Sequence, residues 1–143
     1  MSHVNMLYKL FRKIFVPEIA HAHCDIPCGI YTAEPALTAA KTVVKMVEKI
    51  QETDSSDVHA ISRFTAVKEE HAQICKEQLL ILWTDYFKPG HLGDFPDLHE
   101  TFWKTAKLCS KNKQEVNMEA AKELLSAVEG IAEMFTKTEQ AKS

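Results

Sequence analysis

Four stretches of the chain carry apolar residues at the three- and four-residue spacing of an amphipathic α-helix. Their approximate ranges are 32–51, 58–88, 94–113 and 117–135. The inward positions that they predict are Leu37, Ala40, Val43, Val44, Val47 and Ile50; Val58, Ile61, Phe64, Val67, Ile74, Leu82, Trp83 and Tyr86; Leu98, Phe102, Thr105, Leu108 and Cys109; and Ala121, Leu124, Leu125, Val128, Ile131 and Phe135. His71 falls on the second of these faces.

Short polar or Pro/Gly-containing connections separate the four stretches, and no segment alternates apolar and polar residues as a strand would. Asn117 stands where the N-cap of the last helix is expected. The pattern therefore predicts an all-α protein, an antiparallel four-helix bundle. Bundles of this kind host many functions, so the fold alone does not indicate the chemistry.

Composition narrows the function classes. With 143 residues, 45% of them hydrophobic, the chain can bury a core without structural metal or disulfides, so a metal would be functional. A formal charge of -3 gives no reason to expect nucleic acid as a partner, and no apolar run approaches the roughly 20 residues of a membrane span. Cys75 and Cys109 fall within helical patterns and are expected to be buried, inert thiols.

Residues 1–22 differ from the rest because their basic residues outnumber the single acid, Glu18. The segment ends in an alanine-x-alanine sequence like that of a secretion signal, but charges and Pro17 interrupt its apolar stretches. We interpret it as a leader that is removed by proteolysis and is not a secretion signal. A short amphipathic helix packed on the body is the alternative.

The segment after the leader, HCDIPCGIY at residues 23–31, gathers potential metal ligands. Cys24 and Cys28 have three residues between them, so they do not form the C-x-x-C motif of redox sites and zinc knuckles. The spacing alone is compatible with two interpretations of this segment: a tetrahedral zinc site completed by His21, His23 or both, and a Cys24–Cys28 disulfide.

Removal of the leader would add a ligand by making His23 the N-terminal residue. Its amine, together with the backbone nitrogen and thiolate of Cys24, would form consecutive five-membered chelate rings with the donors near one plane. Cys28 could complete a square, because Pro27 and Gly29 allow the chain to fold back. Square-planar nitrogen and sulfur donors favour nickel(II) or copper(II), and thiolates tend to reduce copper(II), which leaves nickel.

Two segments also resemble a known family. Residues 23–31 match the H-C-D-x-P-C-G-x-Y pattern of the hook in nickel-containing superoxide dismutases, and LWTDYFKP at 82–89 is similar to that family's other characteristic segment. The resemblance implies disproportionation of superoxide to dioxygen and hydrogen peroxide through Ni(II)/Ni(III) cycling, as an antioxidant defence. It further implies a cytoplasmic homohexamer of four-helix bundles, one nickel ion per subunit, and a protease that removes the leader.

The resemblance also implies the metal ligands: the amine and axial imidazole of His23, the backbone nitrogen and thiolate of Cys24, and the thiolate of Cys28. An ungapped alignment puts Ala39 and His71 where well-known members carry a glutamate and an arginine that orient the axial histidine. His71 could substitute as a hydrogen-bond partner.

Four further residues are implied near the reacting atoms. Tyr31 would stand over the open face of the metal with Tyr86 behind it, Asp25 would brace the hook, and Lys88 would add positive potential that attracts the anion. Their positions also fit plainer roles: Tyr86 in the core, Lys88 as a solvated cation, and Asp25 as a turn former.

Two alternatives of other classes remain. One is a non-catalytic helical bundle that stores or carries nickel or zinc, and the other is a secreted bundle with a disulfide in the hook. The alanine-x-alanine end of the leader leaves export open. The N-terminus discriminates storage from catalysis, because only the planar redox site requires a free His23 amine.

Overall fold

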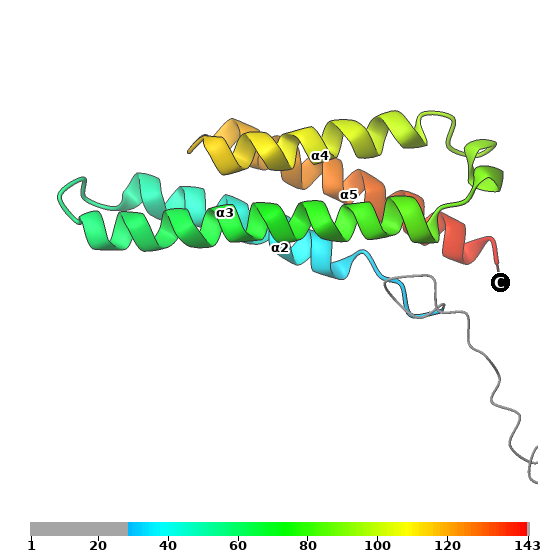
Figure 1. Cartoon of the computed structure of the whole chain (residues 1–143), viewed down its shortest axis with the longest axis horizontal. Helices are drawn as coiled ribbons and strands as arrows, with labels where there is room; N and C mark the ends of the chain where they lie inside the picture. Colours follow the sequence, from blue (N-terminus) through cyan, green and yellow to red (C-terminus); the bar gives the residue numbers. More distant parts are fainter. Residues whose placement is uncertain (1–28, 143) are drawn as a thin grey trace, which may run out of the picture.

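The computed structural model describes residues 29–142, and its long elements are four helices. They are α2 (Glu34–Glu52), α3 (Val58–Ile81), α4 (Leu98–Gln114) and α5 (Met118–Gln140). Figure 1 shows an up-and-down arrangement in which each helix runs antiparallel to the one before it, and α5 returns beside α2. The described range contains no strand. The all-α, antiparallel four-helix prediction is thus confirmed.

Side-chain caps fix where two of the helices begin. The Asp57 carboxylate accepts the amide hydrogen of Ala60 (3.0 Å) at the start of α3. At the start of α5, the Asn117 side chain accepts from the Ala120 amide (3.1 Å), as the sequence predicted. The α5 helix continues to Gln140, beyond the predicted end at residue 135.

The core is formed by small and branched apolar side chains from all four helices. Its members include Ala40, Val43, Val47, Cys75, Leu79, Phe102, Cys109, Leu124, Val128 and Ile131. The predicted inward faces of α2, α4 and α5 supply most of them. Cys75 and Cys109 are buried free thiols, as expected, and the hydrogen bond to Cys109 together with burial raises the pKa of Cys75.

The predicted face of α3 is wrong at its first residue, Val58, whereas Ile61 and Phe64 in the following turns are half-buried. Val58 is 70% exposed, whereas Lys68 and Ala72 are buried. The cause is visible in Figure 1, where the α2–α3 hairpin extends past the connection between α4 and α5. The first turns of α3 therefore pack on α2 and lack the second layer of helices that would bury the opposite side.

Lys68 is a buried cation in the middle of this bundle, with a relative exposure of 1%. Its ammonium donates hydrogen bonds to the backbone carbonyls of Asn112 and Glu115, the latter at 2.8 Å. These carbonyls belong to the C-terminal end of α4, where backbone acceptors lack partners within the helix. Desolvation by burial lowers the pKa of Lys68.

The second predicted helix does not continue as an α-helix to residue 88. After Ile81 the chain forms a wider π-helical turn, η1 (Leu82–Tyr86), closed by the Phe87 amide donating to the Leu82 carbonyl at 3.0 Å. A short 3₁₀ turn, η2 (Pro89–Leu92), follows. The π-helical turn delivers Tyr86 and Phe87 into the core with exposures of 6% and 7%. Such turns often occur at functional sites.

The end of α3, the beginning of α2 and the C-terminal end of the described chain all lie at the same end of the bundle (Figure 1). Within residues 29–142, no helix is long and apolar enough to cross a membrane.

Candidate functional site

A cavity of about 260 Å³ opens at this end of the bundle. Its lining residues are Gly29, Tyr31, Asp85, Tyr86, Lys88, Glu139 and Lys142. They come from the segment before α2, the η1 turn with the two residues after it, and the last turn of α5 with the residues that follow the helix. Three residues that the sequence pointed to, Tyr31, Tyr86 and Lys88, are thus brought together. A larger and more open groove of about 610 Å³ between α2 and α5 has none of these three in its lining.

Tyr86 combines a packed ring with a hydroxyl that reaches the cavity. The ring lies 4.5 Å from that of Phe135 and 4.9 Å from that of Phe87, measured between centroids. Tyr31 tilts against it at 5.7 Å with an angle of 57° between the ring planes. The two tyrosines therefore form one wall of the cavity, and the core holds that wall in place.

The hydroxyl of Tyr86 is held by the end of α5. It donates a hydrogen bond to the Glu139 carboxylate, and the Lys142 ammonium lies 3.3 Å from the hydroxyl oxygen and 4.5 Å from the ring centroid. Burial, followed by the hydrogen bond to Glu139, raises the pKa of Tyr86 to about 12. Tyr86 is therefore protonated at neutral pH.

Sequence reasoning missed Glu139 and Lys142. Their spacing of three residues could have predicted the ion pair between them, had the last helix been expected to reach this far; its N–O distance is 2.6 Å. Nothing local in the sequence indicated their contact with Tyr86, which lies 53 positions before Glu139. Lys142, followed by the Tyr86 hydroxyl, lowers the pKa of Glu139.

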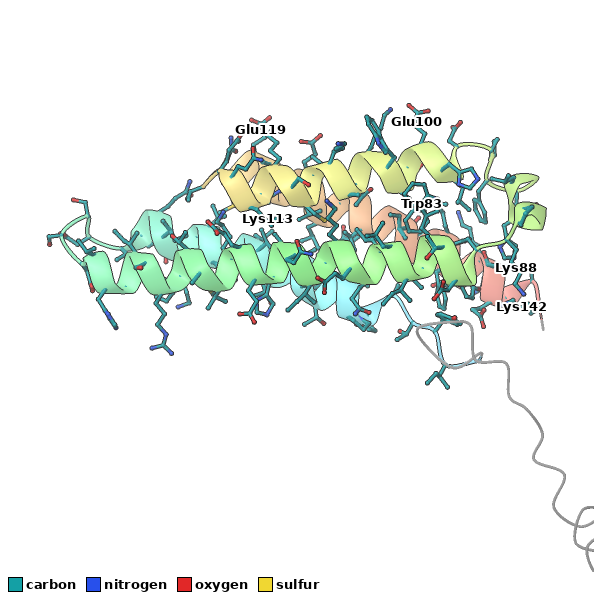
Figure 2. All side chains as sticks on the ribbon, viewed as in Figure 1. Trp83, Lys88, Glu100, Lys113, Glu119 and Lys142 are labelled. Carbon is teal, nitrogen blue, oxygen red and sulfur yellow. The ribbon has the colours of Figure 1, made fainter. Side chains whose placement is uncertain are left out.

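Lys88 stands exposed at the cavity, and its backbone is fixed by His91. The Lys88 amide donates to Nδ1 of His91 at 3.1 Å, and the His91 amide donates to the Lys88 carbonyl at 2.9 Å. The His91 ring in turn stacks 6.1 Å from the ring of Tyr86. Figure 2 shows Lys88 and Lys142 at one end of the bundle, far from Lys113 and Glu119 near the connection between α4 and α5. His91, which the sequence analysis had not singled out, links Lys88 to the tyrosine wall.

The predicted hook residues His23, Cys24, Asp25 and Cys28 lie outside the described residues. Among residues 29–142, no three His, Cys, Asp or Glu side chains are grouped closely enough to hold a metal ion. Gly29 directly follows Cys28 in the chain and lines the cavity, with a positive φ of 95° that favours glycine. The two thiols and the imidazole of the hook are suitable ligands for nickel, and in the sequence they come just before Gly29, which lines the cavity.

The positions aligned with the family's axial-histidine brace are Ala39 and His71. Ala39 is buried on α2 and has no side-chain hydrogen-bonding group. On α3, Nδ1 of the half-buried His71 lies 2.9 Å from the carbonyl of Val67, so Nδ1 carries a proton directed to its own helix. Only Nε2 of His71 could serve as a substitute brace.

Comparison with known proteins finds one family by a family model and by individual relatives alike. A model of the family described as nickel-containing superoxide dismutase matches residues 18–139. Superoxide dismutase [Ni] from Streptomyces seoulensis and that from Streptomyces coelicolor are each 33% identical over 133 residues, covering 92% of this chain and 100% of the relative.

Solved structures agree with this match. A native nickel superoxide dismutase structure has a TM-score of 0.76 and 33% identity, covering 82% of this chain and 99% of the other. An apo structure gives a TM-score of 0.74 at 31% identity, with 78% and 99% covered.

Proposed function

The chain belongs to the nickel-containing superoxide dismutases, and on this premise we propose that His23, Cys24 and Cys28 hold its nickel once residues 1–22 have been removed. The protein is a superoxide dismutase that converts superoxide to dioxygen and hydrogen peroxide. Nickel, one ion per chain, supplies the one-electron chemistry by alternating between Ni(II) and Ni(III).

The observation that carries the proposed site is the cavity that begins one residue after Cys28. Tyr31 and Tyr86 form its wall, and the packing of Tyr86 against Phe135 and Phe87 keeps that wall rigid. We infer that the two rings limit entry to small molecules and that their hydroxyls order water. Lys88 at the cavity attracts the superoxide anion, because a cation near the entrance raises the local concentration of an anionic substrate. Asp25 is proposed to brace the hook.

Cleavage before His23 is proposed because it creates a primary amine beside the two cysteines. An internal His23 would offer the metal only its imidazole and an amide nitrogen.

Assembly and location follow from the family resemblance. We propose a homohexamer on the basis of that resemblance. We propose the cytoplasm as the location, because charges interrupt the apolar stretches of the leader as they would not in a secretion signal.

The test compares three forms: the full chain, a chain that begins at His23, and a chain that begins at Ala22. The last form keeps every ligand side chain and loses only the free amine of His23. We expect the form starting at His23 to bind about one nickel per chain and to consume superoxide, and the other two to show little activity. Intact mass, metal analysis and superoxide consumption are the measurements.

The same experiment distinguishes the rival function. A protein that stores or carries metal through its thiolates would bind nickel or zinc equally well in the forms starting at Ala22 and at His23. If the form starting at His23 bound nickel but consumed no superoxide, the proposed site would be wrong.

A further inference from the structure

Two residues at the cavity, Glu139 and Lys142, have no assigned role. Glu139 lies in the last turn of α5, and Lys142 follows the helix two residues after its end at Gln140, beyond residue 139, where the match to the family model ends. Their charged groups are about half exposed, at 47% and 54% of the side-chain area. An exposed ion pair of this kind usually contributes little to stability. Here, however, both partners also contact the buried Tyr86.

Glu139 determines the direction of the Tyr86 hydroxyl. The hydroxyl donates its hydrogen to the Glu139 carboxylate, which as an ionised group can only accept. The hydrogen therefore points to α5, and the oxygen accepts from the Lys142 ammonium. A phenol without this acceptor could rotate and donate to whatever enters the cavity.

Lys142 offsets the negative charge that Glu139 adds to the cavity lining. A carboxylate in the lining would repel an anionic substrate, and Asp85 already contributes one. The Lys142 ammonium lies 2.6 Å from Oε1 of Glu139 and offsets its charge, so Lys88 and Lys142 together balance the two carboxylates. Removal of Lys142 would leave the lining with a net negative charge.

We propose that Glu139 and Lys142 are positioning residues for superoxide dismutation: Glu139 orients the Tyr86 hydroxyl toward α5, and Lys142 offsets the Glu139 charge so that superoxide can enter. This inference rests on the proposed function, in which superoxide reaches the hook through this cavity. The two parts are tested separately.

The first test measures the contact without nickel or activity. The chain has three tyrosines, so a full chain with Tyr8→Phe and Tyr31→Phe retains only Tyr86. Its phenolate absorbance is followed against pH, with helical circular dichroism recorded on the same samples to restrict the reading to folded protein. Glu139→Gln is expected to lower the pKa of Tyr86 from about 12 toward the ordinary value of 10. Lys142→Met is expected to raise it, because a cation that favours the phenolate is lost.

The matched control is the Glu100–Lys104 ion pair on α4, which has an N–O distance of 2.7 Å and similar exposure. Glu100→Gln and Lys104→Met should leave the Tyr86 titration unchanged. Opposite shifts from Glu139→Gln and Lys142→Met would not result from a general loosening of the fold. Shifts in the same direction, or none, would overturn the proposed contact.

The second test measures substrate entry in the nickel-loaded enzyme. Lys142→Met should lower kcat/KM by roughly threefold to tenfold at low ionic strength, and the loss should shrink as salt is added. Lys142→Arg, which keeps the charge, should restore most of the rate, and Lys104→Met should have no effect. An active enzyme in which Lys142→Met behaves like Lys104→Met would refute the inference and leave the proposed function intact. Failure of every nickel-loaded form to consume superoxide would refute the proposed function instead.

Discussion

Tyr86 shows how one side chain can belong to both the core and the cavity. Its ring is predictable from the apolar spacing of the second helix, and the family resemblance pointed to its hydroxyl. The partners of that hydroxyl were not predictable, because a contact between residues 86 and 139 depends on how two helices end side by side. Local pattern carries no information on such a pair.

Replacement of this tyrosine has a consequence for stability at high pH. Because the folded-state pKa of about 12 lies above the ordinary value of 10, the folded protein holds this proton more tightly than the unfolded chain. The resulting stabilisation is fully present below pH 10 and is lost as the pH rises from 10 to 12. In urea unfolding at a series of fixed pH values, the stability of Tyr86→Phe should not show this part of the decline, a difference of at most about 2.7 kcal/mol for a shift of two pKa units. Identical pH dependences for the two proteins would contradict the raised pKa.

At the scale of elements, the sequence predicted which segments are helices better than it predicted where each helix ends and which helices cover it. The inward faces of α2, α4 and α5 were correct because apolar periodicity directly reflects which side of a helix is buried. It failed for Val58, since periodicity does not indicate where the adjacent helices stop. The π-helical turn was also not predicted. The sequence around Thr84 has the same apolar spacing as the α-helix before it, so nothing in it marks the wider turn.

Apolar periodicity also could not predict that Lys68, a charged residue within α3, is buried. In Lys68→Met, the carbonyls of Asn112 and Glu115 lose their donor, and Asn112 is fully buried. We expect the free energy of unfolding to fall by about 1–3 kcal/mol, the usual cost of unpaired buried polar groups. Urea denaturation measures this change. The control is Lys41→Met on the exposed side of α2, which should change stability by less than about 0.5 kcal/mol. Equal effects of the two substitutions would show that the Lys68 hydrogen bonds contribute nothing.

At the scale of the whole molecule, the helical bundle and the hook (residues 23–31) have separate roles. The hook motif alone indicated the metal chemistry, whereas the described residues supply a cavity and a core that is complete without metal. The sequence predicts a ligand set because the candidate residues lie within one short segment. It could not indicate that the end of α5 joins the same site, since that requires the full antiparallel path of the chain.

This division predicts that metal binding and folding can be lost independently. Cys24→Ser and Cys28→Ser should each abolish nickel binding and superoxide consumption, while helical circular dichroism and the unfolding midpoint of the metal-free protein stay unchanged, because the bundle has its own core. Cys109→Ala, which truncates a fully buried core thiol, should show the reverse: nickel binding persists and stability falls by about 1–2 kcal/mol. Metal analysis and thermal unfolding of the three variants are the measurements. Loss of helical structure in either hook variant would mean that the hook is part of the fold, and retained nickel binding would mean that the ligand set is wrong.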